Sequence, residues 1–303
     1  MSRNSDSGKF EAEYNPSRED ILAYIQRCEE EFGKVTRDKV LSEYPISRSN
    51  IENEFETFSK AKLSANLDKT GRVSLKQEEL NNINKECSEN RKLDSVIKGL
   101  LMGDGSLDYK GESNPCLSVS MINKRFLDYL KSSYPRFFTD VKLKSTSSTA
   151  AMYARESGFR PEAKEENYHN FYTVRSRRLP FLNKYTSWYD SGEKRYPNDL
   201  KIDKDMVKMW YVGDGNVNHK DGSRSSITIT CKNESDRMKF IANLFKEKGF
   251  NPKIRSKGAV EFLVDDAEKM LSWMGNAPNG FEYKWEISDN SNYTQLKQKT
   301  YTK

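Results

Sequence analysis

Two aspartates in this sequence occupy the same unusual position, between two glycines at the end of an apolar stretch. Asp104 lies in LLMGDGSL (100–107) and Asp214 lies in WYVGDGNV (210–217). Each apolar stretch predicts a buried helix, and a carboxylate at its last turn is disfavoured because that end of a helix carries partial negative charge. The same costly arrangement in two places indicates that both carboxylates have a chemical role.

A structural explanation and two other chemical ones compete with that role. Gly-Asp-Gly after a helix is commonly a C-cap followed by an Asx turn, which accounts well for one copy but poorly for two in matched contexts. A calcium loop of the EF-hand type is excluded because its glycine position holds Tyr109 or His219 and its glutamate position holds Pro115 or Ser225. The sequence contains no phosphate-binding loop of the form GxxxxGK followed by Ser or Thr, so nucleotide hydrolysis has no support.

The residues after the two aspartates also correspond. Apolar residues occur at offsets of 13, 15 and 17 after each aspartate: Leu117, Val119 and Met121 in the first copy, Ile227, Ile229 and Cys231 in the second. This alternation predicts two strands, each with one apolar face and one face of small polar residues. The polar faces consist of Ser118 and Ser120 in the first copy and of Thr228 and Thr230 in the second.

Each predicted strand is followed by the same series of elements. An amphipathic helix leads to a basic strand, and a helix containing Trp188 or Trp273 closes the copy. The sequence therefore predicts an α+β fold with an αββαββα unit made twice. The first copy carries about twenty extra residues (147–168), whose Arg155 and Arg160 either extend a phosphate-binding surface or lie in a flexible loop.

Glycines in the two apolar helices predict how the copies pack. Gly99, Gly103 and Gly213 remove side chains from the helix surfaces and allow two backbones to approach closely. A pseudo-twofold pairing of these helices would bring Asp104 and Asp214 together. Two like charges are costly at close range unless a cation lies between them, and hard oxygen ligands suit Mg²⁺. Two carboxylates, metal ions and a phosphodiester make a hydrolysis site.

The N-terminal part of the chain predicts a separate helical module. Ser17 and Asp20 form a capping box, Gly33 ends the first helix, and Ser49 and Glu52 form a second capping box. Three short helices with tight turns suit a DNA-binding helix-turn-helix type of module or any small helical bundle. The predicted boundaries are a mobile tail at 1–16, an accessory helical module at 17–67, a connector with some helix at 68–92, the first copy at 93–198, the second at 199–287, and a tail at 288–303.

The composition is that of a folded, water-exposed protein. The formal net charge of +6 permits a nucleic-acid partner without establishing one. No apolar run reaches the roughly 18 residues of a membrane span, and the first ten residues have no apolar signal segment. The four cysteines are far apart and there are only two histidines, so no zinc spacing exists. We expect reduced thiols in an intracellular protein of the cytoplasm, nucleoid or organelle matrix.

The segments Ile97–Gly105 and Val207–Gly215 resemble the two motif copies of a monomeric LAGLIDADG homing endonuclease. The link WYDSGEKRYPNDLKIDKDMVKMWYVGDG (188–215) and the closing FEYKWEI (281–287) are similar to that family too, and the likeness covers about 195 residues. The helical module resembles the repeat often attached to homing endonucleases, with Phe55-Glu-Thr-Phe58 in place of the usual FGSW. The family pattern departs at three places without loss of a needed group, namely Met102, Met209 and Val212.

The resemblance implies a catalytic site. Asp104 and Asp214 would be the catalytic carboxylates that bind Mg²⁺, for which Mn²⁺ can substitute, and the carbonyls of Gly103 and Gly213 would add metal ligands. Lys194 and Lys284 match the basic residues that flank the two active sites of the family, where they stabilise charge or order the attacking water.

The resemblance also implies that the two sheets form a saddle over the DNA major groove. Polar strand residues would then read base edges while lysines and arginines contact phosphates. The expected DNA-binding residues are Ser118, Ser120, Lys142, Lys144, Arg175, Arg177, Thr228, Thr230, Lys253 and Arg255. The implied activity is hydrolysis of both strands of a long asymmetric site by a monomer.

Two other functions remain open at this point. An RNA maturase that binds intron RNA, or a DNA-binding regulator, could use the same scaffold, and loss of either aspartate would favour them. Intein splicing has less support, because the chain lacks a terminal His-Asn followed by a nucleophile and starts with Met. We therefore expect a free-standing or intron-encoded endonuclease.

Overall fold

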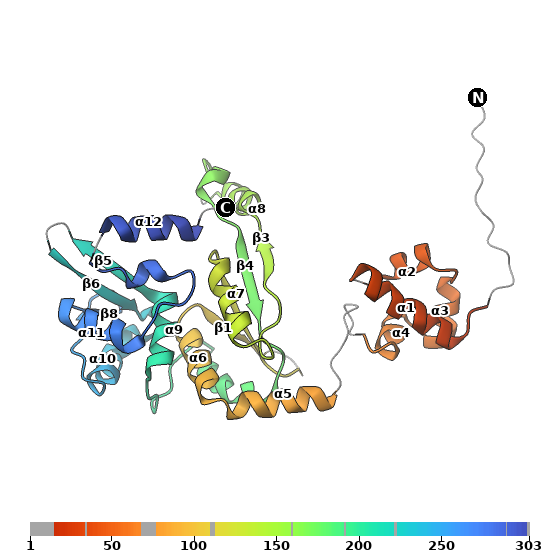
Figure 1. Ribbon diagram of the computed structural model, residues 1–303, viewed down its shortest axis with the longest axis horizontal. Coiled ribbons are helices and arrows are strands. Elements are labelled where there is room, and N and C mark those ends of the chain that lie inside the picture. The colour runs from red at the N-terminus through yellow and green to blue at the C-terminus, as the bar shows by residue number, and fades with distance from the viewer. Residues whose placement is uncertain are drawn as a thin grey trace. The chain divides into compact units, whose positions relative to one another are not determined.

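The computed structural model describes residues 15–33, 35–67, 77–109, 113–158, 160–190, 192–220, 223–288 and 290–301. The chain divides into two compact units, Met1–Leu80 and Asn81–Lys303 (Figure 1). All but the last two residues of the predicted mobile tail lie outside the described residues, as does the first part of the predicted connector, 68–76. In the described ranges, no helix combines the length and the apolar character needed to cross a membrane.

The first unit contains helices packed around a core of their own. The predicted capping box is confirmed, since Asp20 N donates to Ser17 Oγ (3.1 Å) and Ser17 N donates to Asp20 Oδ2 (3.0 Å). Gly33 ends the first helix in the left-handed conformation (φ 64°). The core includes Ile21, Ile25, Val40, Ile51 and Phe55. The helices are α1 (Arg18–Phe32), α2 (Arg37–Glu43), α3 (Arg48–Phe55) and α4 (Phe58–Ser64).

Two details of this unit differ from the sequence prediction. The third predicted helix is split into two, because the chain turns at Glu56, which has a positive φ of 62°. The second capping box was assigned wrongly to Ser49 and Glu52. It is made by Ser47 and Asn50, whose reciprocal bonds are 2.8 and 3.2 Å, because the helix begins two residues earlier.

Helix α5 (Gln77–Glu89) crosses the boundary between the units, and from Asn81 onward it belongs to the second. Ile83 and Cys87 are buried there. Asn84 Oδ1 accepts a hydrogen bond from Phe181 N (2.9 Å), and Glu86 pairs with Arg136 (2.9 Å). The second half of the predicted connector is therefore packed against the first αββαββα copy.

The second unit has the predicted α+β fold with two antiparallel four-stranded sheets. Their strand orders are β1-β2-β4-β3 and β5-β6-β8-β7. The first copy contains α6 (Arg91–Met102), β1 (Gly105–Asp108), β2 (Cys116–Met121), α7 (Lys124–Ser133), β3 (Lys142–Ser145), β4 (Phe171–Arg175) and the 3₁₀ segment η2 (Pro180–Tyr189). The second contains α9 (Lys204–Asp214), β5 (Gly215–Lys220), β6 (Ser223–Thr230), η3 (Lys232–Arg237), α10 (Met238–Lys246), β7 (Lys253–Arg255), β8 (Ala259–Phe262) and α11 (Val264–Met274).

The strand register bears out the internal repeat. Gly105 lies opposite Val119 in the first sheet, and Gly215 lies opposite Ile229 in the second, at the same offset from the preceding aspartate. The apolar residues of both alternating strands are buried, as predicted. The first copy closes with a 3₁₀ segment rather than an α-helix, and Trp188 is buried within it.

Two regions have more structure than the sequence suggested. The insertion forms α8 (Ser147–Glu156) and the 3₁₀ segment η1 (Glu165–Asn167), joined by a bond from Ser147 Oγ to Glu165 Oε1 (2.9 Å). Arg155 makes a contact within the insertion, because its Nη1 donates to the Ala163 carbonyl (2.6 Å). The terminal segment continues from η4 (Glu282–Trp285) into α12 (Asn290–Tyr301), where Tyr293 packs on the rings of His219 and Tyr283.

The two copies meet through α6 and α9, which lie side by side between the sheets (Figure 1). A Cβ built on Gly99 would overlap the carbonyl oxygen of Met206, and one on Gly213 would lie 2.9 Å from Asp104 N and 3.2 Å from Gly103 Cα. Real Cβ atoms essentially never come within 3.0 Å of another heavy atom, as both of these would. The glycines are therefore required by the helix contact, as the sequence predicted.

Replacing Gly99 by Ala should destabilise the second unit by about 3 kcal/mol, because the new methyl group has no space against Met206. All four tryptophans lie beyond residue 180, so tryptophan fluorescence during urea unfolding reports on this unit alone. The neighbouring Lys98→Ala is the control and should cost less than about 1 kcal/mol. Equal stabilities of the two variants would contradict this description of the helix contact.

Candidate active site and nucleic-acid interface

The two aspartates lie at the ends of the paired helices. Gly103 is the C-cap of α6 and Asp104 follows it, while Asp214 is the last residue of α9. A Cβ on Gly213 would be only 3.5 Å from Asp104 Cγ, so the two helix ends are in contact. Asp104 is exposed and Asp214 is half-buried.

Asp214 has an altered acidity. Burial is the main cause that raises its pKa to about 6, and the negative charge of Asp104 acts in the same direction. Lys194 and Lys284 oppose the increase in pKa but do not cancel it. The structure thus brings the two predicted carboxylates close enough to disfavour their simultaneous ionisation.

The two predicted lysines hold the carbonyl ends of the motif helices. Lys194 Nζ donates to the carbonyls of Gly103 (2.8 Å) and Gly105 (3.2 Å) at the end of α6. Lys284 Nζ donates to Val212 and Gly215, both at 2.7 Å, at the end of α9. Burial lowers the pKa of both side chains, in the case of Lys284 to about 8.

This lysine contact offsets the unfavourable position of the aspartates. The last carbonyls of a helix lack partners within it and carry its partial negative charge. A cation bonded to them, as Lys194 and Lys284 are, reduces the repulsion on the neighbouring carboxylate. This capping contact is a feature that the sequence pattern alone did not indicate.

The donor groups present here fit a hard divalent cation. The described part of the chain contains no group of three or more His, Cys, Asp and Glu residues that could hold a metal. Mg²⁺, however, is commonly bound by one or two carboxylates, with water and substrate phosphate as its other ligands. Asp104 and Asp214 supply two such carboxylates. The Gly103 carbonyl, which accepts from Lys194, has a second lone pair for a further contact.

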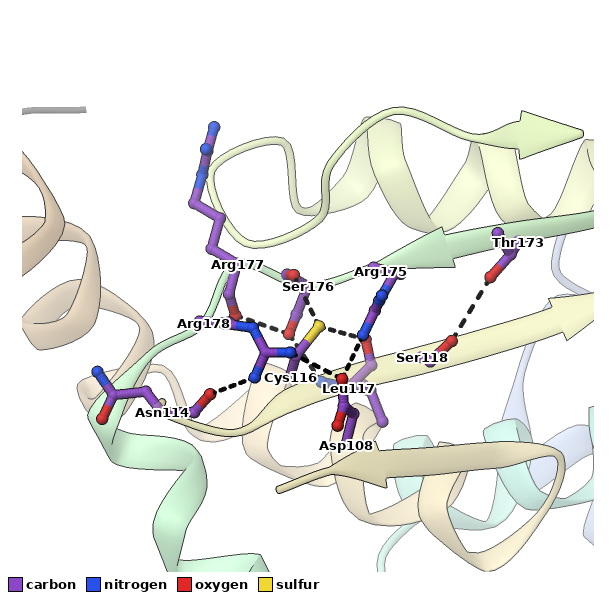
Figure 2. A network of polar contacts seen from close by, with 10 residues as sticks. All are labelled: Asp108, Asn114, Cys116, Leu117, Ser118, Thr173, Arg175, Ser176, Arg177 and Arg178. Carbon is purple, nitrogen blue, oxygen red and sulfur yellow. Dashed lines mark hydrogen bonds and ion pairs between the residues drawn. The ribbon is translucent and has the colours of Figure 1, made fainter. Parts of the chain in front are cut away.

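The first sheet carries the expected polar face, with an acidic residue that the sequence analysis did not select. Ser120 Oγ donates to Thr173 Oγ1 (2.9 Å), and Lys142 lies opposite Thr173 on an exposed strand. Asp108 Oδ2 accepts from both Arg175 (2.6 Å) and Arg178 (2.8 Å). The result is a fixed pair of guanidinium groups at the end of this sheet (Figure 2).

Arg177 is not part of that pair. Figure 2 shows its side chain directed away from Asp108, and its Nε donates to the carbonyl of Arg136 (2.8 Å). Arg178 reaches Asp108 and Arg177 does not, because the strand ends at Arg175, after which simple alternation no longer applies. The run of arginines at 175, 177 and 178, near an aspartate on the first strand, was the available sequence signal.

The other expected residues of this sheet keep to its polar side or edge. Ser118 lies opposite Arg175 in the register, with its hydroxyl 3.5 Å from that of Thr173. Lys144 is exposed near a strand irregularity, and its ammonium lies 5.5 Å from the centre of the Phe171 ring.

The second sheet has an equivalent polar face around a buried acid. Glu261 is 6% exposed and lies opposite both Thr228 and Lys253. Its carboxylate pairs with Arg255 and accepts from Ser226 Oγ (3.1 Å). Thr230 is exposed at the end of the strand, and the residues on this face that sequence reasoning missed are Asn216, Asn218, Ser226 and Glu261.

A profile of the LAGLIDADG DNA endonuclease family matches residues 94–270, which span both copies. The chain belongs to the LAGLIDADG DNA endonuclease family. The homing endonuclease I-WcaI, solved bound to its DNA recognition sequence, has a similar fold, with a TM-score of 0.56 over 69% of this chain and 93% of that one. Its sequence identity is 11%, so this likeness shows the fold alone.

A curated relative is also similar in sequence. The uncharacterized protein MJ1098 of Methanocaldococcus jannaschii is 28% identical over 181 residues, which cover 56% of this chain. The chain spans 62% of the length of that relative.

Asp214→Asn should stabilise the second unit at high pH. Because the folded-state pKa of Asp214 is raised to about 6, the wild-type protein loses stability as pH rises from about 4 to about 6. The asparagine variant lacks this loss, so its free energy of unfolding in a chelator should exceed that of the wild type by about 2 kcal/mol at about pH 8. The difference should disappear near pH 4.

Urea unfolding followed by tryptophan fluorescence at several pH values measures this difference. Asp140→Asn, at a side chain that is 90% exposed, is the control and should show no such pH dependence. A variant that is less stable than the wild type at high pH would contradict the proposed repulsion.

Proposed function

We propose that this chain is a site-specific homing endonuclease that hydrolyses both strands of a long, asymmetric DNA site with the aid of Mg²⁺. The observation that carries the proposal is the pairing of Asp104 and Asp214 at the ends of two abutting helices, each end capped by a lysine, half-buried Lys194 at one and buried Lys284 at the other. Two carboxylates held together at a cost in stability are well explained by a cation that binds them. Membership of a DNA endonuclease family supports the same reaction class.

Each residue of the site would have its own role in the reaction. The carboxylates of Asp104 and Asp214, with the carbonyls of Gly103 and Gly213, would hold Mg²⁺ or Mn²⁺. A bound ion supplies an activated water and neutralises charge on the phosphate and on the leaving 3′ oxygen. Lys194 and Lys284, fixed by the helix carbonyls, add positive charge beside the scissile phosphates and stabilise the charge that develops there. Hydrolysis would leave 3′-hydroxyl and 5′-phosphate ends.

The two polar sheet faces would bind the DNA on either side of the site. Phosphate contacts from lysines position the duplex, while side chains held in fixed orientations read base edges in the major groove. The faces differ, because the first presents two arginines on Asp108 and the second presents Glu261 with Arg255. The two half-sites of the DNA should therefore differ in sequence.

The remaining parts of the proposal concern the whole chain. One chain supplies both carboxylates, so we propose that it acts as a monomer. The helices within 17–67 would add affinity for DNA beside the cleavage site, as an accessory module. The protein would act inside the cell, where its duplex substrate is found.

Cleavage of a plasmid library with a randomised site tests the proposal. With Mg²⁺ the wild-type chain should produce double-strand breaks at one sequence, and EDTA should abolish them. Asp104→Asn and Asp214→Asn should each lower the rate at least about a hundredfold, the effect of removing one group that stabilises transition-state charge. Asp140→Asn, at a side chain that is 90% exposed, is the control and should cleave at the wild-type rate.

A wild-type chain that binds DNA or intron RNA without cutting it would contradict the proposal. That result would favour a maturase or a regulator on the same scaffold. Cleavage that survives both aspartate substitutions would also contradict it.

The arginine pair generates a prediction about recognition. Arg178→Ala should weaken binding by about 1–3 kcal/mol and relax the preference at one base position, because a held guanidinium can bind guanine at two atoms. Lys142→Ala should weaken binding to all sequences and reduce the salt dependence by about one charge.

Fluorescence anisotropy with single-base variants of the selected site, at several salt concentrations, distinguishes these effects. Arg177→Ala is a matched control, since its side chain is directed elsewhere. Loss of specificity in Arg177→Ala but not in Arg178→Ala would contradict the assignment.

A further inference from the structure

Neither Lys194 nor Lys284 lies in an α-helix or a strand. Tertiary contacts must therefore fix the segments that carry them. Lys194 lies in the stretch between η2 and α9, and Lys284 lies in the short 3₁₀ segment η4. Both ammonium groups must remain within hydrogen-bonding distance of the helix carbonyls. Each segment has one tyrosine bond within its own copy, from Tyr196 Oη to the Met102 carbonyl (2.7 Å) and from Tyr211 Oη to the Lys284 carbonyl (2.9 Å). Further contacts come, in each case, from the copy to which the segment does not belong.

The segment that carries Lys194 is anchored by Glu234, in η3 of the second copy. This side chain is fully buried, and its Oε1 accepts a hydrogen bond from Tyr196 N (2.7 Å). Arg237, which pairs with Glu234 (3.3 Å), donates to the Tyr196 carbonyl (3.0 Å). The backbone of Tyr196, two residues after Lys194, is thus hydrogen-bonded through both its N–H and its carbonyl. Arg195 adds two bonds to Asp236, at 2.7 and 2.8 Å.

The segment that carries Lys284 is anchored by Asn123, at the start of α7 in the first copy. Asn123 is 1% exposed, and its Nδ2 donates to the Gly280 carbonyl (2.5 Å) while its Oδ1 accepts from Phe126 N (3.2 Å). Gly280 has a φ of 91°, and a Cβ there would overlap the Asn123 amide. Arg125 adds an ion pair with Glu282 (3.1 Å).

The two anchors occupy equivalent corners of the repeated unit. Asn123 lies two residues after the end of β2, and Glu234 lies four residues after the end of β6, each at the turn into the following helix. A buried carboxylate is costly without partners, and the partners of Glu234 include Arg237 and the Tyr196 N–H, which ties it to the segment of Lys194.

Each lysine is bonded to the backbone around one aspartate. Lys194 donates to the carbonyls of Gly103 and Gly105, on either side of Asp104, and Lys284 donates to those of Val212 and Gly215, around Asp214. The segment of each lysine is therefore anchored by the other copy at the end of one motif helix.

We infer that Glu234 and Asn123 are positioning residues, each of which fixes the lysine that serves one of the two strand-cleavage reactions. The inference rests on the proposed endonuclease function. Each reaction centre is a composite, because Lys194 of the first copy depends on Glu234 of the second, and Lys284 of the second copy depends on Asn123 of the first. Loss of an anchor should then slow the cutting of one strand and spare the other.

Strand-resolved cleavage of the selected plasmid site in Mg²⁺ tests this inference. Glu234→Met removes the acceptor for Tyr196 N at similar volume and should slow one strand at least about tenfold, which corresponds to about 1.4 kcal/mol. Nicked circles should accumulate, and the slowed strand should be the one slowed in Lys194→Met. Glu234→Gln keeps an acceptor oxygen and should recover much of the rate.

Asn123→Asp is the matching change in the other anchor. It keeps the Oδ1 acceptor for Phe126 N but loses the donor to Gly280, so it should slow the opposite strand, as Lys284→Met does. Exposed Glu247→Gln and Asn243→Asp are the controls and should cut both strands at wild-type rates. Tryptophan fluorescence confirms that each variant is folded under the assay conditions.

The outcomes separate this inference from the proposed function. If the wild-type chain cuts no DNA, the proposed endonuclease function fails. If it cuts DNA but the folded anchor variants slow both strands equally, or neither, the positioning role is overturned and the endonuclease function stands. A slowed strand that differs from that of the corresponding lysine variant also overturns the role.

Discussion

The contact between α6 and α9 determines the rest of this structure. Glycines at 99 and 213 bring the two backbones so close that no Cβ fits between them at these points. The helix ends, and with them Asp104 and Asp214, are therefore forced together. Burial first, and the nearby charge of Asp104 second, raise the pKa of Asp214, so the fold holds a carboxylate at its centre whose ionisation is disfavoured.

The elements next to the helix ends reduce this unfavourable charge and extend from it. Lys194 and Lys284 cap the helix carbonyls, which removes part of the negative field that the helix ends would add. The first strand of each sheet starts directly after the helix end, so the two polar sheet faces extend from the carboxylates. The proposed catalytic centre and the proposed DNA-binding faces are thereby fixed relative to one another by a few residues at the centre.

Much of this arrangement could be predicted from the sequence, because each copy of the repeat can be checked against the other. Matched offsets after Asp104 and Asp214 predicted the strands, and the strand register confirms the same pairing in both sheets. Glycine spacing predicted the helix contact. Both are local patterns with a fixed geometric meaning, which is why they could be read directly.

Features that depend on contacts distant in sequence could not be predicted in this way. Arg178 rather than Arg177 reaches Asp108 because the strand ends at Arg175, and a strand end depends on its neighbours rather than on alternation. Helix α12 is weakly patterned and depends on Tyr293 packing against rings from two other elements. The anchors Glu234 and Asn123 become visible only when the folded copies place them on each other's segments.

Anomalous diffraction from crystals grown with saturating Mn²⁺ tests directly whether a cation is held between the paired carboxylates. We predict anomalous density in contact with the side-chain oxygens of both Asp104 and Asp214, absent from crystals of the double asparagine variant. Ordered density at some other carboxylate cluster, with none at this pair, would contradict the account.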